Sequence, residues 1–487
     1  MDYLYAIYTD PEANINVIDV RESHGSDCVY SPLVQRYRTS DGPGGINGFW
    51  RFDSVTGIGP FNSFYAAVNL RDDSSVYEKD DSIEKRMDTA AGTVAYLLDP
   101  GNLGRTLAGN PYDPALYNIM LVVPTVYWSS VRVIPPESSG NLAAGAEYNV
   151  LYMSSKPEYR PPGHPEITGM KAYAHSASTV PGTVDFETAV YPYLGIGVYE
   201  SYVTADADAV GAGLLVSQSG RAPAAGPDND GFKAYADNLV PASKNRSRLQ
   251  SDYQQWNYFQ WTFYKMMCYA VMGSKNVETM VGAGFTGYAK TDSSAVTGST
   301  DGIGFIGSAD CTDNAAGSTY CEMGKTSAKL FIENGWGSLN EFVGDAFVKG
   351  DTSSTQRLHA GNYLGGENVL GERNQPDMGQ PWADIFAKGA AHRVIAATSV
   401  QPATWDTPIS ADANSSAYSD SEYPGDIVNS RDSGVSSITV GGRWDNSHYA
   451  GLGFACAGYD ISLANQFRGA RLAYLMSEDA LSDTPIR

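Results

Sequence analysis

The sequence has few cysteines, few basic residues and no long apolar run, and each absence argues against a class of protein. Only five cysteines occur among 487 residues, and none stands in a CxxC or Cys/His spacing of the kind that holds zinc. Lys and Arg number 33 against 55 Asp and Glu, which gives a formal net charge of −22. Such a surface repels phosphate backbones and anionic lipids, so we expect neither nucleic acid nor a membrane as a partner.

Membrane-spanning and export signals are also missing from the sequence. The most apolar run, Ile119 to Trp128, contains Pro124 and is much shorter than the roughly 20 residues that cross a bilayer. The N-terminus carries Asp2 and no basic stretch, so we expect no Sec-type signal peptide. Export, if it occurs, then uses another route, such as incorporation into a particle.

The common catalytic and cofactor motifs are absent as well. There is no Walker A, HExxH or GxSxG motif, and GIGFIG at 302–307 lacks the strand-to-helix context of a dinucleotide-binding turn. The six histidines are scattered without ligand spacing, so we expect no enzyme activity, no metal site and no cofactor. Two acidic stretches have carboxylates close enough to bind Ca²⁺, although a solvated turn is the favoured interpretation of both. They are PDNDGF (Pro227–Phe232) and DADA (Asp206–Ala209).

Three of the cysteines need an interpretation. Cys311 and Cys321 lie close enough in sequence for a loop disulfide, and two ordinary thiols are the alternative. Cys456, in FACAG, has no base near it in sequence, which favours a structural thiol over a nucleophile.

What the sequence does contain is 51 glycines, 25 prolines and many short apolar, β-branched runs. This combination predicts an α+β protein with many short strands joined by turns. The expected strands are LYAIYTD, INVIDV, FYAAVNL, Thr93–Pro100, Tyr117–Ile134, AEYNVLYM, Ala189–Val203, Ile438–Trp444 and Ala470–Met476.

One long helix is predicted over Ser251–Gly273. Ser251 and Gln254 fit a capping box, and Gly273 stands where a C-terminal cap belongs. Apolar and aromatic residues recur at helical spacing, which predicts a face buried against a sheet rather than a ligand groove. These residues are Tyr253, Trp256, Phe263, Met267 and Ala270.

The order of these elements suggests three regions. Residues 1–85 form a β-rich N-terminal domain, 86–185 a strand-rich connecting region, and 186–480 the main domain. The last of these ends in a stretch, about 440–472, with no clean period of two or of 3.6.

Several segments, in order, resemble one family. They are GTVAYLLDPGN, YNIMLVVPTVYW, YPYLGIGVYE, SDYQQWNYFQWTFYKMMCYAVMGS, VGAGFTG, IENGWGSLNEFVGD and GGRWDNSHYAGLGFACAG followed by RGARLAY. The chain from about residue 90 to 476 thereby resembles the variable proteins of diversity-generating retroelements. These are ligand-binding proteins with a C-type lectin fold, often tropism or tail-tip proteins of phages and archaeal viruses.

The resemblance implies two sets of residues in the C-terminal segment. The frame would be Gly441, Gly442, Trp444, Gly451, Gly469, Arg471 and Leu472. The diversified, ligand-facing positions would fall among Arg443, Asp445, Asn446, His448, Tyr449, Leu452, Phe454, Cys456, Tyr459 and Asp460. A rigid platform then displays side chains that need not build the fold.

The expected function is non-enzymatic binding of a host-cell surface protein or glycan, from a virion or a cell surface, with a homo-oligomer as an option for assembly. Two alternatives remain, an enzyme and a structural protein. The same fold resembles formylglycine-generating enzymes, which need an active-site cysteine pair, and iron-dependent sulfoxide synthases, which need three histidines. The structural alternative is a virion protein whose terminal segment packs against neighbouring subunits.

Overall fold

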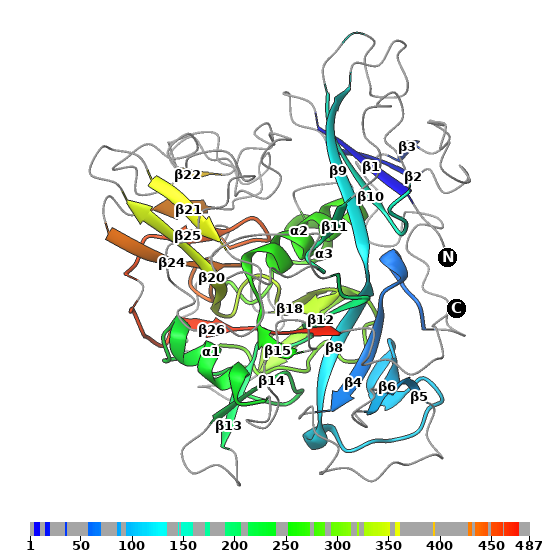
Figure 1. Cartoon of the computed structure of the whole chain (residues 1–487). Coiled ribbons are helices and arrows are strands. Elements are labelled where there is room, and N and C mark those ends of the chain that lie inside the picture. Colours follow the sequence, from blue (N-terminus) through cyan, green and yellow to red (C-terminus); the bar gives the residue numbers. More distant parts are fainter. Residues whose placement is uncertain are drawn as a thin grey trace.

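The chain is a strand-rich α+β protein in the computed structural model (Figure 1). The structure describes residues 57–69, 94–133, 148–158, 190–205, 213–239, 252–272, 277–287, 294–312, 326–350, 434–446, 450–460 and 462–476. It also describes Gly145, residues 171–175 and the strands at 4–9, 15–19, 35–36, 85–88, 319–320, 356–360, 393–394 and 427–430.

An eight-stranded sheet joins segments from most of the chain. Its order is β15 (Asp252–Gln255), β27 (Leu472–Met476), β12 (Tyr193–Gly197), β8 (Tyr117–Pro124), β4 (Phe64–Asn69), β6 (Val94–Asp99) and β5 (Lys85–Asp88), with β7 (Asn102–Thr106) paired to β6. All of its pairs are antiparallel.

The central sheet is buried on both faces, which explains its continuous apolar runs. In β8, Ile119, Leu121 and Val123 belong to one core cluster, whereas Met120 and Val122 belong to another. Since successive side chains of a strand point to opposite faces, both faces of β8 are covered. The strand is therefore apolar at every position from Ile119 to Val123 rather than alternating.

A seven-stranded sheet carries the C-terminal segment. Its order is β21 (Gln356–Ala360), β20 (Asn340–Gly350), β24 (Gly434–Val440), β25 (Ala455–Ala457), β23 (Ile427–Ser430) and β22 (Arg393–Val394), with β26 (Arg468–Ala470) parallel to β20. In Figure 1 its main strands lie to the left of α2, and β8 and β9 (Val126–Val133) lie to the right.

Three smaller sheets complete the described strands. The first has the order β11 (Lys171–Tyr173), β9, β10 (Tyr148–Ser154), β1 (Leu4–Thr9), β2 (Ile15–Asp19) and β3 (Gln35–Arg36). The second is β17 (Thr319–Tyr320), β16 (Ile306–Thr312), β18 (Thr326–Leu330) and β19 (Ile332–Glu333), and the third is the hairpin of β13 (Tyr202–Ala205) and β14 (Gly213–Val216).

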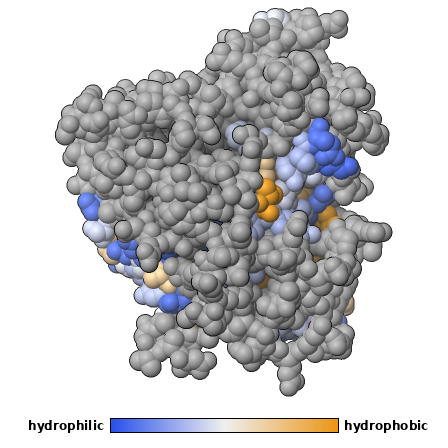
Figure 2. Space-filling view, viewed as in Figure 1, coloured by the Kyte–Doolittle hydropathy of each residue, from blue (hydrophilic) through white to orange (hydrophobic). Residues whose placement is uncertain are grey.

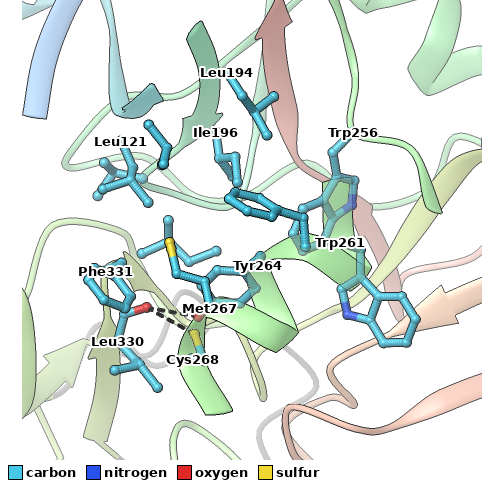
Figure 3. Close-up of a cluster of buried hydrophobic side chains, with 14 of the residues drawn as sticks. Leu121, Leu194, Ile196, Trp256, Trp261, Tyr264, Met267, Cys268, Leu330 and Phe331 are labelled. Carbon is cyan, nitrogen blue, oxygen red and sulfur yellow. Dashed lines mark hydrogen bonds between the residues drawn. The ribbon is translucent and has the colours of Figure 1, made fainter. Parts of the chain in front are cut away.

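Helix α2 (Tyr258–Met272) fills the space between the sheets, and its side chains reach residues far away in sequence (Figure 3). Tyr264 donates its hydroxyl to the carbonyl of Leu330 at 2.9 Å, and Trp261 is fully buried. Two shorter helices are α1 (Asn229–Asp237) and α3 (Glu278–Val281). The prediction that the aromatic stripe is core is confirmed, since all five of its members are buried.

The predicted start of this helix is wrong by seven residues. Asp252–Gln255 is strand β15, which pairs with β27 and stacks Tyr253 on Tyr474 with ring centroids 4.4 Å apart. The capping box lies further along the chain: Gln260 N donates to Asn257 Oδ1 and Asn257 N to Gln260 Oε1, both at 2.9 Å. Apolar residues suit both a strand that is buried on both faces and the helix that follows it. The apolar pattern therefore does not show where the strand ends and the helix begins.

Some strand pairs cross the bounds of the predicted regions. β1 pairs with β10 of the connecting region, and β4 pairs with β8 across residue 85. Within the region predicted as 186–480, β12 near its start pairs with β27 near its end, so that segment closes on itself.

Candidate ligand-binding surface

The Gly441–Gly442 turn requires glycine at both positions. Their φ angles are 82° and 79°, in the left-handed region that favours glycine. A Cβ on Gly442 would lie 2.5 Å from Cβ of Ala450, and one on Gly441 would lie 3.1 Å from the carbonyl oxygen of Gly335. The turn therefore fixes the direction in which the chain leaves β24.

Trp444 secures the chain just after this turn. Its side chain is 3% exposed and packs on Phe467 with ring centroids 5.3 Å apart. Its backbone N–H donates to the carbonyl of Ser338 at 3.1 Å. The two ends of the C-terminal segment are thus joined through one aromatic contact.

Arg471 is fully buried, and all of its nitrogens are hydrogen-bonded. Its Nε donates to Glu341 Oε2 at 3.0 Å, and Nη2 donates to Glu341 Oε1. Nη1 and Nη2 also reach four backbone carbonyls at 2.9–3.0 Å, those of Gly197, Val198, Glu333 and Asn334. Burial disfavours the charge, but the Glu341 carboxylate outweighs it and raises the pKa of Arg471.

A second carboxylate lies beside this pair. Glu200 is buried and accepts a hydrogen bond from the backbone of Leu339 at 2.8 Å through Oε1. Burial, and then the nearby Glu341 charge, raise the pKa of Glu200 well above its usual value. One arginine therefore serves two buried acids, of which Glu341 makes the direct contact.

Five of the predicted ligand-facing positions reach the surface. Asp445, Tyr459 and Asp460 are exposed, and Arg443 and Asn446 are partly exposed. Arg443 lies over the ring of Phe467 at 4.0 Å and donates to Asp445 Oδ2 at 3.1 Å. These residues offer an aromatic ring and charges of both signs on a fixed backbone.

Three predicted ligand-facing positions are corrected by the structure. Leu452, Phe454 and Cys456 are 0%, 6% and 4% exposed. Cys456 lies in β25, an interior strand that is hydrogen-bonded to β24 on one side and to β23 on the other. Leu452, before this strand, belongs to the main core cluster, and Phe454 packs with Cys456. His448 and Tyr449, the two remaining positions, lie outside the described residues.

Arg468 is a residue of this region that sequence reasoning did not single out. It is 1% exposed, and its guanidinium lies 4.3 Å from the ring centroid of Tyr459. Its Nε, Nη1 and Nη2 make no hydrogen bond of good geometry with the described residues. Burial lowers the pKa of Arg468, and the Cys456 thiol and Tyr459 act in the opposite direction. Arg468 and the frame residue Arg471 both lie in RGARL, and nothing in the sequence distinguishes the environment of one from that of the other.

The structure describes some of the residues considered for Ca²⁺ binding, a disulfide or enzyme chemistry. Asp228 of PDNDGF caps α1 by accepting from Gly231 N at 2.9 Å, and Asp206–Ala209 lies outside the described residues, as does Cys321. Cys456 is buried, and burial raises the pKa of its thiol. Over the residues that the structure describes, no three His, Cys, Asp or Glu side chains gather as a metal site.

The surface is mostly polar where it is described on the face in Figure 2, with small apolar spots. No helix in the described part of the chain is both long and apolar enough to span a membrane. No family model matches the chain, and no curated protein matches it significantly.

Proposed function

We propose that the chain is a non-enzymatic ligand-binding protein in which a C-type lectin fold displays a variable surface from residues 440–472. The observation that carries this proposal is the sharp contrast in burial within that segment. Trp444 and Arg471 are buried, whereas three residues between them in sequence are exposed, namely Asp445, Tyr459 and Asp460. Side chains in the exposed group can change without removing a contact that holds the frame.

The surface has the composition that binding requires. Tyr459 offers apolar area with a polar tip and few rotatable bonds, as aromatic residues do in antibody paratopes. Asp445 and Arg443 supply charge for orientation. Display of many copies on a virion or cell would raise the apparent affinity for a host-surface protein or glycan by ~10²–10⁴.

Sequencing codons 440–472 in many copies of the gene, together with the flanking DNA, tests this proposal. We expect substitutions concentrated at positions 443, 445, 446, 459 and 460. A nearby reverse transcriptase and an adenine-rich near-copy of these codons should accompany them. Codons 452, 454 and 456 serve as the internal control, because their side chains are buried and should stay constant.

Uniform codons with no template copy would contradict the retroelement origin. Substitutions spread equally over exposed and buried codons would contradict the division into frame and display surface.

A further inference from the structure

Two arginines three positions apart on the same stretch of chain have opposite environments. Arg471 makes hydrogen bonds to a carboxylate and four carbonyls. Arg468 is equally buried, and within the described part of the chain none of its three side-chain nitrogens makes a hydrogen bond of good geometry. A guanidinium is rarely buried unless it is paired, because the loss of hydration is otherwise uncompensated.

The aromatic contact of Arg468 is made through the flat face of its buried guanidinium. Tyr459 lies over the guanidinium as a stacked ring, and stacking uses the face of the group rather than its in-plane N–H donors. Tyr459 itself is 39% exposed, so the guanidinium lies directly beneath the surface. The nearest exposed residues of the display surface therefore stand beside an unused set of donors.

An unused acceptor accompanies these donors. Arg468 of β26 is the Cα partner of Asn340 in β20, so the two side chains leave the sheet on the same face. Asn340 is 3% exposed, and no described residue donates a hydrogen bond to its Oδ1. A ligand that satisfies both residues needs an anionic acceptor and a hydrogen-bond donor close to each other.

We propose that Arg468 and Asn340 form an anion-binding subsite beneath Tyr459 that takes the carboxylate and adjacent hydroxyl of an acidic saccharide. A planar guanidinium matches a carboxylate with two parallel hydrogen bonds. The neighbouring acceptor favours a group whose carboxylate stands next to a hydroxyl, as in a uronic acid, over an Asp or Glu side chain, which has no such donor. This inference rests on the proposed function and names the ligand class for it.

The experiment measures binding of sodium D-glucuronate to the full-length chain by calorimetry and by the shift in Tm at constant ionic strength. D-glucose tests the need for the carboxylate, and N-acetylaspartate represents an acidic peptide. We expect glucuronate to bind and to raise Tm, and the other two to bind at least tenfold more weakly. Arg468→Met should reduce glucuronate affinity at least tenfold, and should raise the Tm of the unliganded protein because it removes an unpaired buried charge.

Arg221→Met is the matched control. Arg221 is exposed and also lies over a tyrosine ring, that of Tyr202, at 5.5 Å. Its removal deletes the same charge from the surface and should leave glucuronate affinity within twofold. If Arg468→Met does not fold, Arg468→Lys decides by the same criterion, since it keeps the charge and loses the planar fork.

Three results would overturn the subsite: no glucuronate binding, equal loss in the Arg221 control, or N-acetylaspartate binding as tightly as glucuronate. The subsite and the proposed function can be rejected independently of each other. Glucuronate binding through Arg468 with invariant codons at 440–472 would reject the display function and keep the subsite. Variable codons without glucuronate binding would reject only the subsite.

Discussion

Arg471 and Glu341 form a buried ion pair between residues 130 positions apart, with Arg471 Nε donating to Glu341 Oε2 at 3.0 Å. The remaining donors of Arg471 bind carbonyls at 197–198 and 333–334. One side chain therefore connects the end of the C-terminal segment to the central sheet and to β19. This contact holds the frame from which Tyr459 and its neighbours are displayed.

Arg471→Met is expected to destabilise the protein strongly. The substitution leaves Glu341 as an uncompensated buried carboxylate and removes the hydrogen bonds from Arg471 to four backbone carbonyls, which costs about 3–5 kcal/mol. Urea unfolding measures this change, with Arg221→Met as the exposed control. A loss of less than about 1 kcal/mol would mean that the pair does not hold the frame.

Glu200→Gln is expected to stabilise the protein at neutral pH. Because the folded pKa of Glu200 is raised, the folded state holds its proton more tightly than the unfolded state does. Its contribution to stability is therefore fully present below the unfolded pKa and is lost as pH rises through the folded pKa. Glutamine mimics the protonated acid at every pH.

The measurement for Glu200 is unfolding as a function of pH. The variant should exceed the wild type by about 1 kcal/mol or more at pH 7, and the difference should shrink toward zero below the unfolded pKa. A difference of constant size from pH 4 to pH 7 would show that titration of Glu200 is not its origin.

Gly442→Ala is expected to cost more than Gly109→Ala, although both glycines have positive φ, 79° and 85°. Both substitutions carry the left-handed backbone penalty of about 1–2 kcal/mol. At Gly442 the new methyl also meets Ala450 at 2.5 Å, whereas nothing lies within 4 Å at Gly109. Thermal or urea unfolding of the two variants gives the difference, and equal losses would show that the turn has room to adjust.

Replacing three exposed residues together by Ala is expected to leave the free energy of unfolding within about 1 kcal/mol of the wild type, since exposed side chains contribute little. These residues are Asp445, Tyr459 and Asp460. Leu452→Ala, in the same segment, should cost about 2–5 kcal/mol because it empties a fully buried site. The two chemical unfolding curves compare display and core directly. A large loss in the triple variant would mean that these residues belong to the core.

The sequence predicted the elements better than their connections. The run from Ile119 to Val123 in β8 is apolar at every position, and a strand buried on both faces favours that pattern. Helix α2 was expected seven residues too early, because Tyr253 and Trp256 suit either a strand or a helix. The pairing of Arg471 with Glu341 could not be predicted, since nothing local links residues 130 positions apart.

The candidate site was predicted only in part. Absence of a regular period between 445 and 460 suggested a surface segment, but it cannot separate Tyr459, which is exposed, from Phe454, which is buried beside a three-residue strand. Arg468 and Arg471 are the same residue type three positions apart. Only the fold determines that one meets a carboxylate and the other does not.

The most direct test of the central claim compares two libraries of the full-length chain. One randomises positions 443, 445, 446, 459 and 460, and the other randomises 452, 454 and 456. Both are presented by ribosome display, challenged with protease and then selected on immobilised glycans and proteins. We predict that most members of the first library resist protease and that it yields binders to new targets, whereas few members of the second survive. Equal loss of protease resistance in the two libraries would contradict a rigid frame that carries a tolerant binding surface.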